Sequence, residues 1–319
     1  MSSLLQGYQS CSLFAVVVLI TTVGFLYFDA HSPVAPAEYQ TVVEQLGSSK
    51  SEYVSTFALL VLRLTLGSVI WLSCLWALFE PSGLRLTLQV RGKTKKCVLR
   101  NHRRFTTFTM WCWSLLGGYM ALASLCSMAA ISDSSWLKVP HQLLELTPIL
   151  FEVSFAMAYL VTIVVSFVLI PGQEKAGLPT DVFFHPLALL AHNFNVLVMM
   201  IEVCLNRVPI QLRHLPYVML FGIAYILFSW LWFELTGVFY YFFLDYEHPN
   251  AVLWLIGLLL TCSGSYLLGV FLTAAEDYAP VEYLSLVQGG IVLFSLCIMT
   301  VVDRTKPKMT TPTPETKAS

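Results

Sequence analysis

The sequence predicts an all-α fold, a polytopic integral membrane helix bundle of about eight transmembrane helices with both termini in the cytoplasm. Composition is the first observation behind this prediction. Of the 319 residues, 57% are hydrophobic and only 12% are charged, whereas a soluble domain has roughly 45–50% apolar and about 25% charged residues. One buried core cannot absorb such a surplus. Much of the outer surface must therefore contact lipid.

Eight apolar stretches are the second observation, because a helix needs about 20 apolar residues to cross a hydrocarbon core of about 30 Å. Proline or glycine stands at the ends of most of them, as expected where helices stop. The stretches cover residues 12–28, 55–79, 106–131, 147–170, 184–205, 215–243, 251–275 and 284–302. We expect an N-terminal anchor helix and a non-cytoplasmic loop in 1–54, the membrane bundle in 55–302, and a disordered cytoplasmic tail in 303–319.

The first stretch is short, and a cleaved secretory signal is the alternative to a retained anchor. Residues 1–11 contain no Lys or Arg, whereas a signal peptide usually begins with positive charge. We therefore expect this helix to remain in the protein.

The distribution of Lys and Arg predicts the orientation. With a cytoplasmic N-terminus, the cytoplasmic segments carry 13 of these cations and the opposite segments carry 4, as the positive-inside rule requires. The basic segment 91–104 contributes most of them. Its ordinary role is to set topology, and the alternative role is to attract anionic lipid headgroups. The net charge of −1 argues against a basic nucleic-acid-binding protein.

Ionisable side chains within the spans are candidate functional residues, because each is costly to place in a bilayer. These residues are Arg63, Glu152, His185, His192, Glu202 and Glu234. In the span 184–205, helical spacing places His185, His192, Asn195, Met199 and Glu202 on one face. Hydrogen bonding between helices is the ordinary explanation for such a face, and a catalytic or transport site is the alternative.

No metal or cofactor is expected. His185 and His192 are seven residues apart, which is about 10.5 Å along a straight helix and too far for one ion. None of the eight cysteines has a partner at the close spacing of a zinc or redox motif.

The start of the span 106–131 carries several hydroxyl groups near the predicted cytoplasmic surface. It reads Arg103-Arg104-Phe105-Thr106-Thr107-Phe108-Thr109-Met110-Trp111. Helical threonines often bond back to a carbonyl in the preceding turn. A threonine nucleophile, in contrast, needs a base to take its proton, and a neutral histidine is suited to that role.

Predicted topology allows a threonine and a histidine to meet, because the spans 106–131 and 184–205 both begin at the cytoplasmic surface. Thr107 then lies a few ångströms inside the membrane, and His192 lies roughly 8–15 Å deep. A polar pair just below the headgroups suits a lipid ester whose acyl chains remain in the bilayer.

Several further motifs follow His192 in order. They are Ile201-Glu202, Ala224-Tyr225-Ile226-Leu227, Leu235-Thr236-Gly237 and Tyr241-Phe242-Phe243-Leu244-Asp245. Over residues 100–275 the chain resembles the family of androgen-induced protein and androgen-dependent TFPI-regulating protein, and the related rolling-stone-like proteins. The resemblance implies a polytopic hydrolase of fatty acid esters of hydroxy fatty acids.

The family's nucleophilic threonine lies in a basic-aromatic-x-Thr-Phe context, and its histidine lies ten residues before an Ile-Glu pair. The resemblance therefore implies that Thr107 is the nucleophile and His192 the base, with Thr106 as nucleophile if the register is one residue off. Two departures, Leu189 in place of a histidine and Phe242 in place of a proline, bear on substrate preference.

Supporting residues are less defined. Asn195, one helical turn from His192, is expected to shape the pocket, and Glu152 or Glu234 could contact His192 from neighbouring helices. Glu202 lies ten residues along the helix, about 15 Å away, which is too far to orient His192 directly. No oxyanion donor is assigned.

Two other classes of function compete with a hydrolase of lipid esters taken from the bilayer. One is a transporter or proton-coupled carrier, in which Arg63, Glu152, His192, Glu202 and Glu234 form a relay across the membrane. The other is a non-catalytic structural membrane protein, as the rolling-stone resemblance implies. All three are integral multi-pass proteins, in the endoplasmic reticulum or the plasma membrane.

Overall fold

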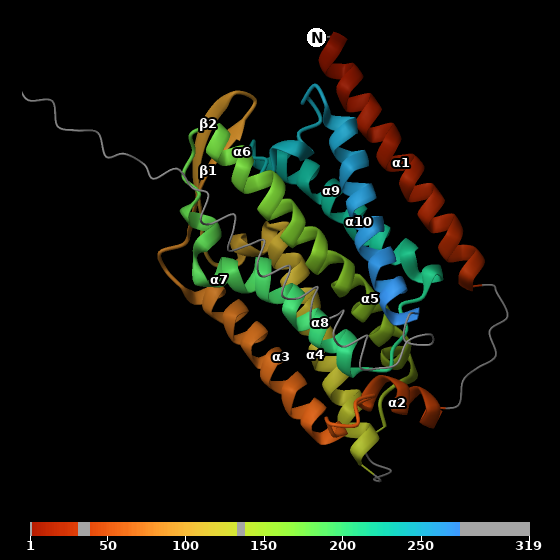
Figure 1. Ribbon diagram of the computed structural model, residues 1–319. Helices are drawn as coiled ribbons and strands as arrows, with labels where there is room; N and C mark the ends of the chain where they lie inside the picture. The colour runs from red at the N-terminus through yellow and green to blue at the C-terminus, as the bar shows by residue number, and fades with distance from the viewer. Residues whose placement is uncertain (1, 31–38, 133–137, 275–319) are drawn as a thin grey trace, which may run out of the picture.

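The computed structural model describes residues 2–30, 39–132 and 138–274, and it confirms the all-α polytopic class. Seven described helical segments are long and apolar enough to cross a membrane, and they alternate in direction through the bundle (Figure 1). The helices are α1 (Ser2–Ala30), α2 (Tyr39–Gly47), α3 (Thr56–Phe79), α4 (Phe108–Ile131), α5 (His141–Val164), α6 (Ile170–Lys175), α7 (Pro186–Leu189), α8 (Asn195–Leu205), α9 (Leu215–Thr236) and α10 (Ala251–Ala274). The predicted span 284–302 and the tail 303–319 lie outside the described residues.

Helix α5 forms the centre of the bundle. Every residue from Phe151 to Val161 is buried, because α4, α8, α9 and α10 all pack against this helix. Helix α1 lies at the outer edge against α9 and α10 (Figure 1). It buries Cys11 and Ala15 while exposing Leu13, Val16 and Ile20, as expected of a helix that faces lipid on most sides.

A β-hairpin occupies most of the basic loop between α3 and α4, and its strands are absent from the sequence prediction. Strand β1 (Leu84–Val90) pairs antiparallel with β2 (Lys93–Leu99). Arg91 and Gly92 form the two-residue turn with φ of 49° and 75°, the positive values that a tight hairpin turn requires. Leu88 and Leu99 pack against residues that follow α9, namely Val238 and Tyr240.

Helix α9 ends earlier than predicted, which corrects the expected span 215–243. Gly237 has φ of 65°, a left-handed conformation that stops helices and suits glycine. The hairpin reinforces this end, because Lys95 Nζ donates to the carbonyl oxygens of Thr236 at 3.3 Å and Gly237 at 2.9 Å. The chain from 237 to 250 then crosses the end of the bundle, with one short 3₁₀ helix at Phe242–Leu244.

Two π-helical segments lie in the predicted spans 147–170 and 184–205. Val165–Leu169 continues α5 directly into α6, so this span ends at Lys175 and not near residue 170. A local π turn accommodates the missing amide of Pro171. Leu190–Phe194, which contains His192, joins α7 to α8. Single π turns in helices are often found at functional sites.

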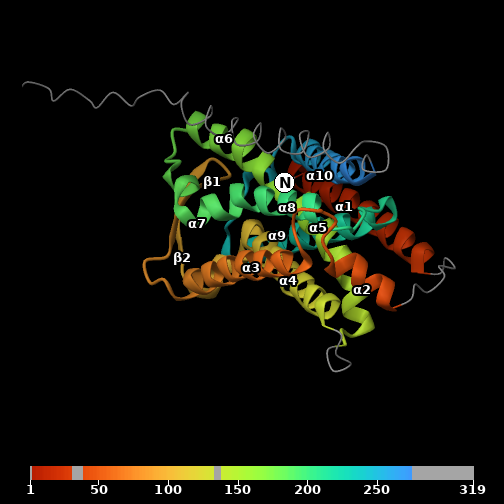
Figure 2. The same ribbon diagram turned by 60° about the horizontal axis from the view of Figure 1, so that its bottom comes forward.

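The hairpin marks one end of the bundle and α2 marks the other. Figures 1 and 2 both place β1 and β2 beside α6, with α2 at the opposite end. The N-terminal end of α1 lies at the hairpin end (Figure 1). This arrangement agrees with the predicted cytoplasmic location of the basic segment and the N-terminus, although the orientation itself stays a prediction.

Candidate active site

A cavity of about 560 Å³ opens at the hairpin end of the bundle. Its walls come from β1, the start of α4, the segment between α6 and α7, the π turn before α8, and the chain after α9. Among the polar side chains on its wall are Arg104, Thr107, Thr109, His192 and Tyr241. The fold thus brings residues from widely separated parts of the sequence to one chamber.

His192 faces a hydroxyl group across this chamber. Its side chain is 9% exposed, and its Nε2 lies 3.3 Å from Thr109 Oγ1. Its Nδ1 is buried and has no hydrogen-bond partner within the described residues. With the ring proton on Nδ1, Nε2 accepts the hydrogen bond from Thr109. In this tautomer the nitrogen that faces the hydroxyl is unprotonated, as a general base requires.

The three threonines at the start of α4 differ in their surroundings. Thr106 Oγ1 donates to Arg103 O at 2.7 Å and lies 2.8 Å from the Tyr240 hydroxyl. Thr107 stands at the N-cap position, lines the cavity, and donates to Arg104 O at 3.0 Å. Thr109 lies in the first helical turn. Because α4 begins at Phe108, Thr109 is the residue whose hydroxyl reaches His192.

Tyr241, from the chain that follows α9, lines the same cavity as Thr109. Withdrawal of the phenol from water raises the pKa of Tyr241 to about 12, and a hydrogen bond with the Thr109 side chain partly opposes this rise. At neutral pH the phenol therefore keeps its proton. A nearby tyrosine, Tyr225, donates to Thr106 O at 3.0 Å, in the 3₁₀ segment just before α4.

The backbone of the π turn is held by α5. Thr162 Oγ1 donates to the carbonyl oxygen of His192 at 2.5 Å, and Asn195 Nδ2 donates to Ala158 O at 3.3 Å. Asn195 was expected to shape the pocket. It is buried between α8 and α5 and is not among the residues that line the cavity, so its contribution to the site runs through the backbone around His192.

Glu202 belongs to a separate network with Arg63. The carboxylate receives two hydrogen bonds from the guanidinium at 2.9 Å and 2.8 Å, and both side chains are fully buried. Tyr119 donates to Glu202 Oε2 at 2.7 Å. Arg63 also donates to Ser127 Oγ and to the backbone of α2 at Leu46. This network ties α2, α3, α4 and α8 together near the end opposite the hairpin.

Glu152 and Glu234 also lie in other contacts, which corrects the expectation that either could touch His192. Glu152 Oε1 lies 2.9 Å from His214 Nδ1, and Tyr266 donates to Glu152 Oε2 at 2.5 Å. Tyr246 donates to Glu234 Oε1 at 2.6 Å. No carboxylate of the described residues therefore orients His192.

His185 lines the same cavity as His192 but makes different contacts. Its ring is exposed and stacks on Trp76 with 5.6 Å between centroids. Within the described parts of the chain, no group of three or more His, Cys, Asp or Glu side chains is arranged to hold a metal ion.

No family model, curated protein or solved structure matches this chain. The resemblance to the androgen-induced protein family therefore stays a prediction, and the site rests on its own geometry.

Sequence reasoning did not single out Thr109 or Tyr241. Thr109 lies only two residues from Thr107, and the first residue of α4 decides which of the two hydroxyls faces His192. Tyr241 was placed inside a predicted span, whereas the chain leaves the helix at Gly237. The glycine was the available signal for that exit.

Proposed function

We propose that this protein is an intramembrane lipid ester hydrolase of the threonine type, which cleaves a fatty-acyl ester through an acyl-threonine intermediate. The observation that carries the proposal is the pair formed by Thr109 Oγ1 and His192 Nε2, 3.3 Å apart on the wall of a 560 Å³ cavity. A hydroxyl and an imidazole at this separation are the minimum for nucleophilic acyl transfer with a general base.

The proposed reaction has two halves. In the first, His192 Nε2 takes the proton of Thr109 Oγ1 as that oxygen bonds to the ester carbonyl carbon. The bond to the alcohol oxygen then breaks, and His192 returns the proton to this leaving group. In the second half, His192 takes a proton from water, which attacks the acyl carbon, and Thr109 leaves as its hydroxyl is restored.

Two threonines compete for the role of nucleophile. The family resemblance designates Thr107, whose hydroxyl lines the same cavity but donates to Arg104 O. Thr109 has the base within hydrogen-bonding distance, and geometry is the first requirement for proton transfer. We therefore assign the nucleophile to Thr109 and keep Thr107 as the alternative.

Tyr241 is the oxyanion donor in this proposal. The negative charge of a tetrahedral intermediate develops next to the attacking oxygen, and donors already in place there often give the largest catalytic contribution. Tyr241 lines the same cavity as Thr109, and its raised pKa keeps the phenol protonated at neutral pH.

A proton relay across the membrane is less well supported. Between Asn195 and Glu202, the buried residues of α8 are Val196, Val198, Met199 and Met200. A relay needs polar groups at every depth, whereas these apolar residues separate the His192 site from the Arg63–Glu202 network. A purely structural role would leave the contact between His192 and Thr109 without a purpose beyond packing.

The basic hairpin suggests where anionic lipid headgroups could bind. Lys93, Lys96 and Arg100 are exposed, whereas Arg91 pairs with Glu247 at 2.9 Å and Lys95 caps α9. The exposed cations would face the headgroups of either the endoplasmic reticulum or the plasma membrane.

Hydrolysis of a lipid ester by purified protein in mixed detergent–lipid micelles tests the proposal. A palmitoyl ester of hydroxystearic acid is the substrate, and the released acid is measured by mass spectrometry. We expect Thr109→Ala and His192→Ala each to lower kcat by about 10³-fold or more. Thr106→Ala, outside the cavity wall, is the matched control.

A fluorophosphonate probe should label the parent protein and fail to label Thr109→Ala. If Thr107→Ala abolishes hydrolysis and Thr109→Ala does not, the nucleophile is Thr107. Equal hydrolysis by the parent and by every folded variant would eliminate the hydrolase.

A further inference from the structure

A second cavity, narrow and almost wholly apolar, lies inside the bundle. Its volume is about 100 Å³, and its walls come from α1, α4, α5, α9, α10 and the chain after α9. A cavity of roughly 10–15 Å³ already admits one water-sized group, so this space has room for several such groups. Water is not stabilised in an apolar cavity of this kind, because a buried water molecule needs two to four polar partners.

The apolar cavity and the larger cavity at the hairpin end share part of their walls. Thr109, Leu169 and Tyr241 line both. The hydroxyl that contacts His192 therefore stands where a hydrocarbon-lined chamber meets the larger chamber, whose wall also carries charged and polar side chains. An ester whose carbonyl lies at this junction would extend its acyl chain in one direction and its alcohol in the other.

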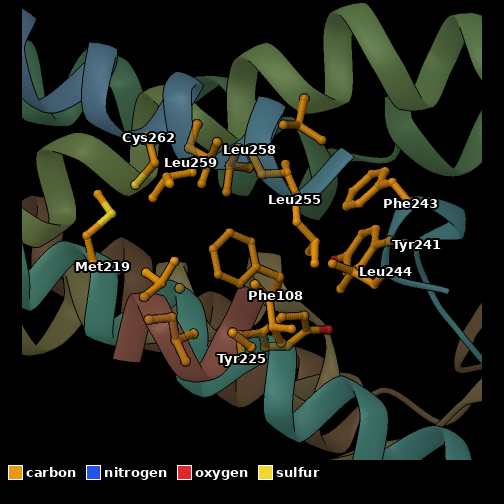
Figure 3. A pocket seen from close by; sticks show the side chains of 18 of the residues that line it. Phe108, Met219, Tyr225, Tyr241, Phe243, Leu244, Leu255, Leu258, Leu259 and Cys262 are labelled. Atoms are coloured by element: carbon orange, nitrogen blue, oxygen red, sulfur yellow. The ribbon is translucent and has the colours of Figure 1, made fainter. Parts of the chain in front are cut away.

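The apolar cavity extends away from this junction. In Figure 3, Tyr241 and Phe243 lie at one end and Met219 and Cys262 lie at the other, with Phe108 between them. Helix α1 closes one side with Phe14, Ala15 and Val18. Because most of α1 faces outward, this helix forms the wall between the cavity and the surrounding lipid.

The wall of the apolar cavity has open space beside Gly222 of α9. A Cβ atom added to Gly222 of α9 would meet no atom within 4 Å, although Gly222 lines the cavity. A side chain introduced there would therefore begin in open space on the cavity wall.

We infer that the apolar cavity binds the acyl chain of the substrate, with the carbonyl carbon at Thr109 and the chain running past Gly222 toward Met219 and Cys262. The inference rests on the proposed hydrolase function, and it names the part of the ester that the protein recognises. Each methylene group buried in such a cavity strengthens binding by about fourfold, so longer chains are favoured until the cavity is full.

Binding of a free fatty acid tests the chain site without any catalysis. The parent protein and two variants are titrated with a fluorescent sixteen- to eighteen-carbon polyene fatty acid in detergent. Gly222→Phe should weaken binding at least tenfold. Gly257→Phe is the matched control, because Gly257 of α10 is exposed, does not line the cavity, and also has open space around its Cβ position.

The same variants are then compared with p-nitrophenyl acetate and p-nitrophenyl palmitate. The ratio of palmitate to acetate kcat/KM should fall at least tenfold in Gly222→Phe and stay at the parent value in Gly257→Phe. Gly222→Ala, a smaller change that leaves most of the space open, should lie between the parent and Gly222→Phe.

Each outcome bears on a specific claim. Fatty acid binding that is equal in the parent and Gly222→Phe, or absent from the parent, would overturn the chain site. If the parent binds the fatty acid and Gly222→Phe does not, the site stands even if no ester is hydrolysed, and only the proposed catalysis then fails.

Discussion

His192 has one ring nitrogen against a hydroxyl and the other buried without a partner among the described residues. In a serine-type triad, a carboxylate orients the histidine and stabilises its charged form. Here the imidazole is held by its backbone, through the π turn and Thr162. We therefore expect a modest turnover rate and a large dependence on the groups that stabilise the developing negative charge.

Removal of the Tyr241 hydroxyl tests that dependence. Tyr241→Phe keeps the ring and loses the donor, so kcat should fall by about 10²–10³-fold with little change in KM. Tyr246→Phe is the control, since Tyr246 lies on the same segment but donates to Glu234. An unchanged kcat in Tyr241→Phe would remove Tyr241 from the mechanism.

The protonation of Tyr241 also predicts how kcat depends on pH. Because the pKa of Tyr241 is raised to about 12, the phenol keeps its proton well beyond the ordinary pKa of about 10. The parent rate should not fall between pH 9 and pH 10.5 through loss of this proton. A decline in kcat centred near pH 10, absent from Tyr241→Phe, would contradict the assignment.

Glu80 forms an ion pair with Arg104 on the wall of the larger cavity. Hydrogen bonds from Ser82 and the contact with Arg104 lower the pKa of Glu80 to about 2. Since the folded pKa lies below the unfolded value of about 4.3, this group stabilises the fold above that value, and the stabilisation is lost as pH falls toward 2. Arg104, 4% exposed, would then lose its counter-charge on the cavity wall.

The thermal stability of the Glu80→Gln variant at different pH values tests this linkage. The variant should melt below the parent at pH 7, and the difference should shrink as pH falls from about 4.5 to about 2. Thermal unfolding in detergent, followed by circular dichroism, measures both. A difference that grows on acidification would reverse the sign and contradict the linkage.

At the scale of elements, the π turn Leu190–Phe194 positions His192. Thr162 and Asn195 hold this turn against α5. Thr162→Val has nearly the same shape and leaves the carbonyl of His192 without its donor, so it should destabilise the fold by about 1–3 kcal/mol. Displacement of a catalytic group by about 1 Å costs up to 10²-fold in rate.

The kinetic and thermal effects of Thr162→Val are measured together. Thr261→Val is the control, because Thr261 makes a similar bond to Gly257 O on the outer face of α10. We expect kcat to fall in Thr162→Val beyond any loss of folded protein and to stay constant in Thr261→Val. If both variants keep the parent kcat, the π turn does not depend on this contact.

Helices were predictable as elements, whereas several of their ends were not. Continuous apolar stretches are a direct consequence of spanning lipid, and α3, α4 and α10 lie within a few residues of their predicted limits. The hairpin is short and half exposed. Its signals are weaker, namely the alternation of Leu84, Leu86 and Leu88 and the Arg91-Gly92 turn. The many Lys and Arg residues of this segment were interpreted only as a signal of topology, so the weaker strand signals were overlooked.

At the scale of the whole molecule, the Arg63–Glu202 pair supports the end of the bundle that lies away from the site. Removing one partner of a buried ion pair leaves an uncompensated charge and costs about 3–5 kcal/mol. Arg63→Met should therefore greatly reduce the yield of folded protein and its thermal stability. A double variant, Arg63→Met with Glu202→Met, should recover much of the loss.

Activity of the folded fraction separates this structural role from transport. The double variant should hydrolyse esters at nearly the parent rate per folded molecule, because the pair lies in a network apart from the cavity. A relay mechanism predicts that transport is abolished whenever Glu202 is replaced. Size-exclusion yield and specific activity together distinguish the two cases.

By itself, the sequence determined that much of the surface contacts lipid, the class of fold, most of the spans, and the two spans that carry Thr109 and His192. These properties depend on local hydrophobicity, charge and chain order, which add up residue by residue. Tertiary structure decided which threonine faces His192, which tyrosine joins it, and where the three glutamates find their partners. A rotation of about 100° per residue separates neighbouring side chains on a helix, so the register of a site depends on where each helix begins and how it packs.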